Sequence, residues 1–208
     1  MNESRSRKIV FGSLLGATAL IVLLTYLLLT SDDLRPSTLG GGDGKFGGEF
    51  TLQSLGGDVS LSNFRGKVVM LYFGFTQCKE VCPMSMGTIR NTLLKMQQNE
   101  LEQVQVVLVS FDPERDTLKA LDEYSKKYHP NIVGVTGSKQ QIEEVIDNYG
   151  AFFRLDGVEL TEAEQSDLNY AFRHSSRYYI IDQEGELVDA MRHSSTANEL
   201  AARIRTLI

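Results

Sequence analysis

The chain is poor in cysteine, because its 208 residues include only two, Cys78 and Cys82. A small scaffold held together by disulfides needs several pairs, so these two cysteines are better explained as a site than as a brace. The chain also lacks an excess of positive charge: 21 Lys and Arg face 27 Asp and Glu, and the formal net charge is −6. Nucleic-acid-binding domains normally present a basic face, so the charge argues against that function.

One uncharged apolar run, Ile9–Thr30, extends over 22 residues near the start of the chain. As a helix it is long enough to cross a bilayer core of about 30 Å. Basic residues precede the run and acidic residues follow it: Arg5, Arg7 and Lys8, then Asp32 and Asp33. The positive-inside rule therefore predicts a cytosolic stub at residues 1–8, an anchor at residues 9–30 and export of the rest.

A cleaved signal peptide is the alternative interpretation of this run. Its apolar region would usually be shorter and would end in a small-residue cleavage site, which is not evident after Leu29. No Arg- and Ser-rich transit segment precedes the run, which favours a bacterial inner membrane over a mitochondrion. We therefore expect a single-pass anchor with the remaining chain on the periplasmic side.

Residues 31–48 are predicted to be a flexible tether, because six of the nine residues from Gly40 to Gly48 are glycine. A chain of this kind spans on the order of 20–25 Å, which lets a domain move above a membrane surface. The remaining residues, 49–208, are expected to form one domain.

Strand and helix patterns alternate along residues 49–208. Strands are predicted at 67–73, 104–111, 132–135, 176–182 and 186–191, and helices from Pro83 to about Asn99, at 118–128, from Ser138 to about Tyr149, and from Thr196 onward. Capping boxes, Ser138 with Gln141 and Thr196 with Glu199, mark the starts of the last two helices. The order predicts an α/β protein with parallel crossovers first and a hairpin near the end, as in a thioredoxin-like fold, with an insertion at 158–168.

The sequence Cys78-Lys79-Glu80-Val81-Cys82-Pro83 lies in the loop between the first long strand and its helix. The free N–H groups and partial positive charge of a helix N-terminus stabilise a thiolate, which is both a nucleophile and a metal ligand. Three residues between the cysteines, rather than the two of dithiol reductases, leave room for a metal between the sulfurs. Two thiolates favour Cu(I), and an added imidazole accommodates Cu(II) or Zn(II).

The chain has three histidines from which a third ligand would come. His129 and His193 are predicted to be ordinary surface residues. His174 immediately precedes the strand at 176–182, which a thioredoxin-like arrangement brings beside the cysteine loop. From the local sequence alone, a solvent-facing loop histidine remains the alternative for His174.

Several motifs, in this order, resemble the Sco/SenC family of copper proteins. They are Phe64-Arg65-Gly66-Lys67, Tyr72-Phe73-Gly74-Phe75-Thr76, Cys78-x-x-x-Cys82-Pro83, Asp112-Pro113-Glu114-Arg115-Asp116-Thr117, and His174 ahead of Tyr179-Ile180-Ile181-Asp182-x-x-Gly185. The resemblance implies a thioredoxin-like fold that binds one copper, as Cu(I) or Cu(II), through Cys78, Cys82 and His174. It also implies two partners. One is a thiol reductant, and the other is cytochrome c oxidase subunit II or another envelope copper protein. The family delivers copper to the dinuclear copper site of subunit II, or reduces the thiols of that site.

Three residues depart from the family pattern: Lys79 stands where proline is common, Gln77 where histidine is frequent, and Arg173 where an acidic residue often precedes the ligand histidine. Cations near the sulfurs stabilise thiolates and lower their pKa. We therefore expect Lys79 and Arg173 to make a Cys78–Cys82 disulfide easier to reduce.

Other functions and residues carry less weight. A thiol-disulfide oxidoreductase and a redox or copper sensor remain alternatives to a metallochaperone. A peroxidase of the peroxiredoxin type is disfavoured, because such an enzyme has Thr or Ser three residues before its reactive cysteine and Pro four residues before that. Here those positions hold Phe75 and Leu71.

Met84 and Met86 are predicted to pack in the core rather than to bind copper. Asp112 and Asp116 are interpreted either as a turn or as a loop near the site.

Overall fold

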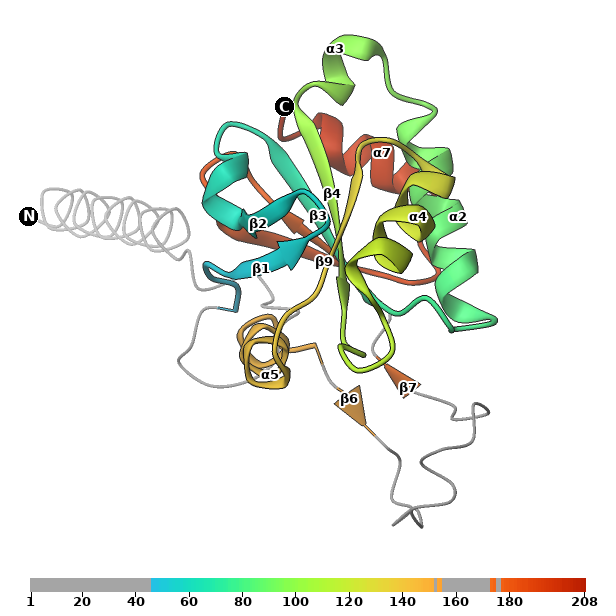
Figure 1. The fold of residues 1–208 in the computed structure, drawn as a ribbon. Coiled ribbons are helices and arrows are strands. Elements are labelled where there is room, and N and C mark those ends of the chain that lie inside the picture. Colours follow the sequence, from blue (N-terminus) through green and yellow to red (C-terminus); the bar gives the residue numbers. More distant parts are fainter. Residues whose placement is uncertain (1–45, 152, 155–172, 175–176) are drawn as a thin grey trace, which may run out of the picture. The chain divides into compact units, whose positions relative to one another are not determined.

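The computed structural model describes residues 46–151, 153–154, 173–174 and 177–208. Their main feature is a five-stranded sheet in the order β5-β4-β3-β8-β9 (Figure 1). The strands are β3 (Val68–Gly74), β4 (Val104–Ser110), β5 (Ile132–Val135), β8 (Arg177–Ile181) and β9 (Leu187–Arg192). β3, β4 and β5 are parallel, whereas β8 runs antiparallel to both β3 and β9. The predicted α/β order, with parallel crossovers first and a hairpin last, is therefore confirmed.

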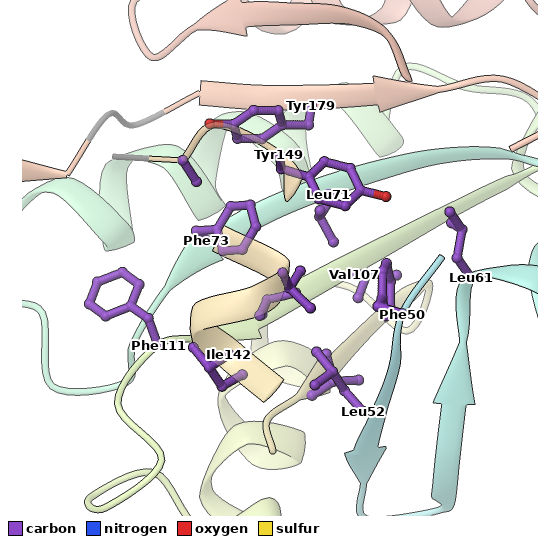
Figure 2. Close-up of a cluster of buried hydrophobic side chains, with 14 of the residues drawn as sticks. Phe50, Leu52, Leu61, Leu71, Phe73, Val107, Phe111, Ile142, Tyr149 and Tyr179 are labelled. Atoms are coloured by element: carbon purple, nitrogen blue, oxygen red, sulfur yellow. The ribbon is translucent and has the colours of Figure 1, made fainter. Parts of the chain in front are cut away.

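Side chains of β3 alternate between the two faces of the sheet, and each face carries its own core. On one face, Met70 packs in a cluster with buried residues of α2 (Val81–Leu93), α4 (Leu118–Tyr128) and α7 (Ala197–Arg205). On the other face, Leu71 packs with residues of α5 (Lys139–Asn148) and of the N-terminal hairpin (Figure 2). The sheet is thus covered on both sides, which explains why β3 is buried along its whole length.

The N-terminal hairpin was not predicted from the sequence. It consists of β1 (Thr51–Ser54) and β2 (Gly57–Ser60), followed by the short 3-10 helix η2 (Leu61–Phe64). Each strand has only four residues and β2 has no fully buried residue, so neither forms a recognisable apolar run. Their position is set by long-range packing, because Leu52 and Leu61 are buried in the core that faces α5.

The helix after the cysteine loop was predicted to reach about Asn99, and this prediction was wrong. α2 ends at Leu93, and a separate short helix, α3 (Gln98–Leu101), follows. Between them the chain makes a turn in which the Met96 N–H donates to the Leu93 carbonyl at 3.1 Å. The Met96 side chain is buried in the same core cluster as Leu93 and Ile89 of α2, so the apolar spacing runs on past the end of the helix.

The other boundaries follow the local signals. α4 and β5 have the predicted limits, and α5 begins after Ser138, whose hydroxyl accepts from the Gln141 N–H at 3.3 Å. α7 begins in the same way after Thr196, whose hydroxyl accepts from Glu199 N–H. Both capping boxes are therefore confirmed.

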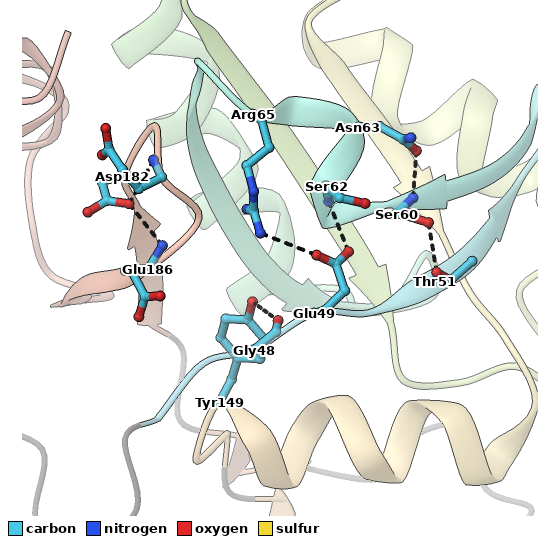
Figure 3. Close-up of polar contacts among 11 residues, drawn as sticks. Gly48, Glu49, Thr51, Ser60, Ser62, Asn63, Arg65, Tyr149, Asp182 and Glu186 are labelled. Atoms are coloured by element: carbon cyan, nitrogen blue, oxygen red, sulfur yellow. Dashed lines mark hydrogen bonds and ion pairs between the residues drawn. The ribbon is translucent and has the colours of Figure 1, made fainter.

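The chain enters the domain at the end of α5 (Figure 3). The Gly47 N–H donates to the Asn148 carbonyl at 2.7 Å, and the Tyr149 hydroxyl donates to the Gly48 carbonyl at 2.8 Å. Gly47 has a φ of 105°, and a Cβ atom there would lie 2.8 Å from the Leu187 Cβ. The positive φ and the lack of space for a Cβ atom both require glycine at this position. The two hydrogen bonds attach this end of the glycine-rich segment to the domain.

Several predicted features lie outside the described residues: the stub at 1–8, the anchor at 9–30, most of the tether at 31–48 and the insertion at 158–168. Within the described residues, no helix combines the length and the apolar character needed to cross a membrane.

Candidate functional site

Both cysteines lie at the carboxyl end of β3, where the chain passes into α2. Pro83 lies in the first turn of α2, as the sequence predicted, but the helix begins two residues earlier than predicted, at Val81, so Cys82 belongs to this turn rather than to the loop. Cys78 lies in the preceding loop, and its sulfur accepts a hydrogen bond from the Cys82 N–H at a distance of 3.3 Å. This N–H is one of the amides that a helix leaves unpaired at its N-terminus, so the helix directs a donor at the first sulfur.

The two thiols have different surroundings. Cys82 is completely buried and belongs to the same core cluster as Phe73 and Phe111, whereas Cys78 packs at the edge of that cluster and is partly exposed. The pKa of the Cys82 thiol is raised far above its ordinary value, first by its hydrogen bond with Cys78 and then by burial. Cys78 is therefore the sulfur that a reagent, a metal ion or another thiol meets first, and Cys82 is the inner one.

This difference predicts the order of alkylation. Iodoacetamide at neutral pH is expected to label Cys78 at least about tenfold faster than Cys82, because alkylation needs an accessible thiolate and both burial and a raised pKa disfavour it at Cys82. Mass spectrometry of peptides from the reduced protein, sampled over time, measures both rates. Equal labelling in native protein would contradict the asymmetry, and labelling in denaturant serves as the control in which the two rates should converge.

The loop that joins β3 to α2 has exposed side chains at Gln77, before Cys78, and at Lys79 and Glu80, between the two cysteines. Lys79 is thus placed near the sulfurs in sequence but is open to solvent, which screens its charge. The side chain of Arg173 lies outside the described residues. The effect of these two cations on the disulfide remains a prediction.

Asp112 and Asp116 have separate roles. Asp112 forms a turn, because it accepts the Asp116 N–H at its carbonyl and pairs through its carboxylate with Arg115 at 2.5 Å. Asp116 is buried and accepts the Thr76 N–H at 3.0 Å, so it contacts the cysteine loop directly. No feature of the local sequence distinguishes these two roles, since the contact joins residues 40 positions apart.

The prediction for the two methionines was half right. Met86 is fully buried under the sheet, but Met84 is 65% exposed on the first turn of α2. Two successive positions in a helix are about 100° apart, so a step of two moves the side chain to nearly the opposite face. Packing in the core therefore applies to Met86 alone.

His129 and His193, predicted to be ordinary surface residues, are both half-buried, and each makes a hydrogen bond. The Nδ1 atom of His129 accepts from the Asn131 N–H at 3.1 Å, and its pKa is lowered by burial and, to a lesser extent, by Arg90. A hydrogen bond of 2.7 Å joins Nδ1 of His193 to the hydroxyl of Ser85, a buried residue of α2. This contact spans 108 positions, so no sequence signal would have found it.

His174 belongs to the short strand β7 (Arg173–His174), which pairs antiparallel with β6 (Phe153–Arg154). β8 begins three residues after His174, and Tyr178 of β8 is opposite Tyr72 near the end of β3. The backbone therefore enters β8 at the edge of the sheet from which the cysteine loop leaves. The His174 side chain itself lies outside the described residues.

The described part of the chain contains no group of three or more His, Cys, Asp or Glu side chains arranged to hold a metal ion. The two cysteines are brought together, and the third predicted ligand remains a prediction. A pair of adjacent sulfurs is nevertheless a donor set that suits a soft ion such as Cu(I).

The chain is similar to known proteins in sequence, in structure and by family model. A SCO2-like protein from Rickettsia prowazekii is 32% identical over 193 residues, which cover 92% of this chain and 91% of the relative. Among solved structures, Bradyrhizobium japonicum ScoI with copper bound has a TM-score of 0.66 and 28% identity, covering 78% of this chain and 99% of its own. Apo Sco1 from Thermus thermophilus has a TM-score of 0.68 and 31% identity, covering 79% and 92%. The SCO1/SenC family model matches residues 40–208, and the chain therefore belongs to the SCO1/SenC family.

Proposed function

We propose that this chain is a membrane-anchored copper metallochaperone that binds one copper ion through Cys78, Cys82 and His174. The observation that carries the proposal is the pair of thiols at the start of α2, Cys78 in the preceding loop and Cys82 in the first turn, with the Cys82 nitrogen 3.3 Å from the Cys78 sulfur. Relatives of this chain, ScoI of Bradyrhizobium japonicum and ScoI of Arabidopsis thaliana, have been solved with copper bound. We expect the same ion here, with the sulfurs as soft ligands for Cu(I) and the His174 imidazole completing a site that also accepts Cu(II).

Copper binding requires that both sulfurs lose their protons. The Cys82 N–H donates a hydrogen bond to the Cys78 sulfur, and such a donor stabilises a negative charge there. Cys82 is held as a thiol until a cation approaches, because its pKa is raised by the neighbouring sulfur and by burial. Loading would thus begin at Cys78 and end at Cys82.

The anchor and tether predicted from the sequence would suit a function at a membrane surface. Residues 9–30 would cross the inner membrane, with residues 1–8 in the cytosol and residues 31–48 linking the anchor to the domain. On the periplasmic side the domain would reach a membrane-bound partner. From the family we infer that this partner is cytochrome c oxidase subunit II, at whose dinuclear copper site the chain would assist assembly, or another envelope copper protein.

A thiol-disulfide oxidoreductase is the second candidate, and the asymmetry of the two cysteines favours it. An accessible sulfur that attacks and a buried sulfur that resolves the mixed disulfide are what such exchange requires. In this function the partner's disulfide is reduced to two thiols while Cys78 and Cys82 are oxidised to a disulfide. A cellular thiol reductant would then restore the pair, and the same reductant would be needed before copper loading.

Copper and the disulfide should exclude one another, which separates the two candidates. Reduced full-length protein in detergent is expected to bind one equivalent of copper, and protein oxidised with diamide is expected to bind none, because both thiolates are needed as ligands. Bound metal is counted by elemental analysis and the charge-transfer absorption is recorded for Cu(II). Reduced protein that holds no copper but reduces a protein disulfide would favour the oxidoreductase, and copper bound stoichiometrically by the oxidised form would refute a dithiolate site.

A further inference from the structure

Asp116 is a buried carboxylate beneath the cysteine loop, with 1% of its surface exposed. One of its oxygens, Oδ2, accepts from the Thr76 N–H at 3.0 Å and from the Ser110 hydroxyl at 2.6 Å. The other, Oδ1, accepts from the Thr76 hydroxyl. Three neutral donors therefore converge on one carboxylate.

No ion pair involves Asp116 in the described part of the chain. The adjacent cation, Arg115, pairs with Asp112 instead, at 2.5 Å. Burial of a carboxylate without a cation is unfavourable unless hydrogen bonds replace its hydration, and here all compensation comes from Thr76 and Ser110. Burial of an unpaired carboxylate is energetically costly, and this one lies next to the cysteine loop. We therefore interpret it as serving the site rather than the general stability of the fold.

The donors join three segments of the chain. Thr76 lies two positions before Cys78, and Ser110 is the last residue of β4. The Ser110 hydroxyl also accepts from the Asp112 N–H at 3.1 Å, and the Asp116 N–H donates to the Asp112 carbonyl at 3.0 Å, so Asp116 is itself held in place. The loop that carries Cys78 is thereby tied to the end of β4.

The opposite end of the dithiol pair is already rigid. Cys82 lies in the first turn of α2 and is fully buried. The next residues around Cys78, Gln77 and Lys79, are exposed. The Cys78 N–H donates to the Phe75 carbonyl at 3.4 Å, and its sulfur accepts from the Cys82 N–H at 3.3 Å. Thr76 lies between Phe75 and Cys78, so the hold on Thr76 fixes the direction in which the loop reaches Cys78.

We propose that Asp116 is a positioning residue of the dithiol site, which binds Thr76 through its amide and hydroxyl and so keeps the Cys78 sulfur at the spacing from Cys82 needed to close a disulfide or to hold one metal ion. The metal-holding part rests on the proposed function, whereas the disulfide part concerns the cysteine pair alone. Loss of the contact widens the range of positions that Cys78 samples. The effective concentration of one thiol toward the other then falls, and the disulfide becomes less stable relative to the dithiol.

The test is the thiol–disulfide equilibrium of the full-length protein in detergent, without copper, against glutathione. The reaction oxidises Cys78 and Cys82 to one disulfide and reduces one glutathione disulfide to two glutathione thiols. Asp116→Ala is expected to lower this equilibrium constant about tenfold, which corresponds to about 30 mV for a two-electron couple. Thr76→Val, which keeps the amide donor but loses the hydroxyl, is expected to lower it about threefold, and Thr76→Ser should restore the wild-type value because it restores the hydroxyl.

Thr92→Val is the matched control. Thr92 is a buried threonine of α2 whose hydroxyl donates to the Thr88 carbonyl at 2.9 Å, away from the cysteine loop. This variant loses one hydrogen-bonded hydroxyl, as Thr76→Val does, and should leave the equilibrium constant unchanged. If Asp116→Ala does not fold, the threonine series decides.

An unchanged constant in Thr76→Val, or an equal change in Thr92→Val, would overturn the proposal. The outcome is independent of copper. If the chain proves not to bind copper, the redox shift still tests Asp116, and if the shift is absent, the copper stoichiometry of the wild-type protein still tests the proposed function.

Discussion

Serine in place of Cys78 or Cys82 is expected to lower the affinity for Cu(I) by more than about a hundredfold, beyond the loss typical of an outer-shell partner. The reason is that a hydroxyl is a poor ligand for a soft ion, and a single remaining thiolate cannot hold Cu(I) tightly. His174→Ala is expected to act differently. It should weaken Cu(II) more than Cu(I), because two thiolates alone can hold Cu(I) nearly linearly.

The measurement is competition with a chelator of known affinity for Cu(I), combined with the charge-transfer absorption of the Cu(II) form. His129→Ala is the control for the loss of an imidazole, since His129 is engaged with the Asn131 amide and is not among the predicted ligands. An unchanged Cu(II) spectrum in His174→Ala would exclude His174 as a ligand. Unchanged Cu(I) affinity in both serine variants would exclude the cysteine pair.

The largest expected effect on stability is that of Gly134→Ala in β5. A Cβ atom at this position would lie 2.8 Å from the carbonyl oxygen of Leu121 and 2.7 Å from the hydroxyl of Ser125, both on α4. The serine hydroxyl can rotate away, but the Leu121 carbonyl is helix backbone and moves only if α4 moves. Since close-packed interiors tolerate extra volume poorly, we expect a loss of about 3 kcal/mol in the free energy of unfolding.

Gly87→Ala in α2 provides the matched control, because a Cβ atom there would meet nothing within 4 Å beyond its chain neighbours and the backbone of its own helix. Alanine favours a helix over glycine, so this variant is expected to gain about 0.5–1 kcal/mol. Urea unfolding of the copper-free, reduced proteins, followed by circular dichroism, measures both changes. A Gly134→Ala protein as stable as the wild type would show that α4 adjusts over β5 without penalty.

Features that depend on near neighbours along the chain were predictable from the sequence. The start of α5 at Ser138 and of α7 at Thr196 follows from side chains that bond to backbone amides three residues away. Short apolar, β-branched runs likewise predicted β4 and β5. The placement of both cysteines between a buried strand and the first turn of a helix was predictable for the same reason.

The remaining features depend on residues that are distant in the chain, and packing between layers decided them. α2 ends at Leu93, although Met96 is buried in the same core cluster and continues the apolar spacing of the helix, so the local pattern does not mark this end. The contacts of His193 with Ser85 and of Asp116 with Thr76 span 108 and 40 positions. The amino-acid order therefore indicated which residues would carry the chemistry, since residue type and helix caps are local properties. Which sulfur is buried, and which carboxylate holds the cysteine loop, was settled only when the sheet and its two covering layers came together, because burial and hydrogen-bond distance are properties of the packed chain.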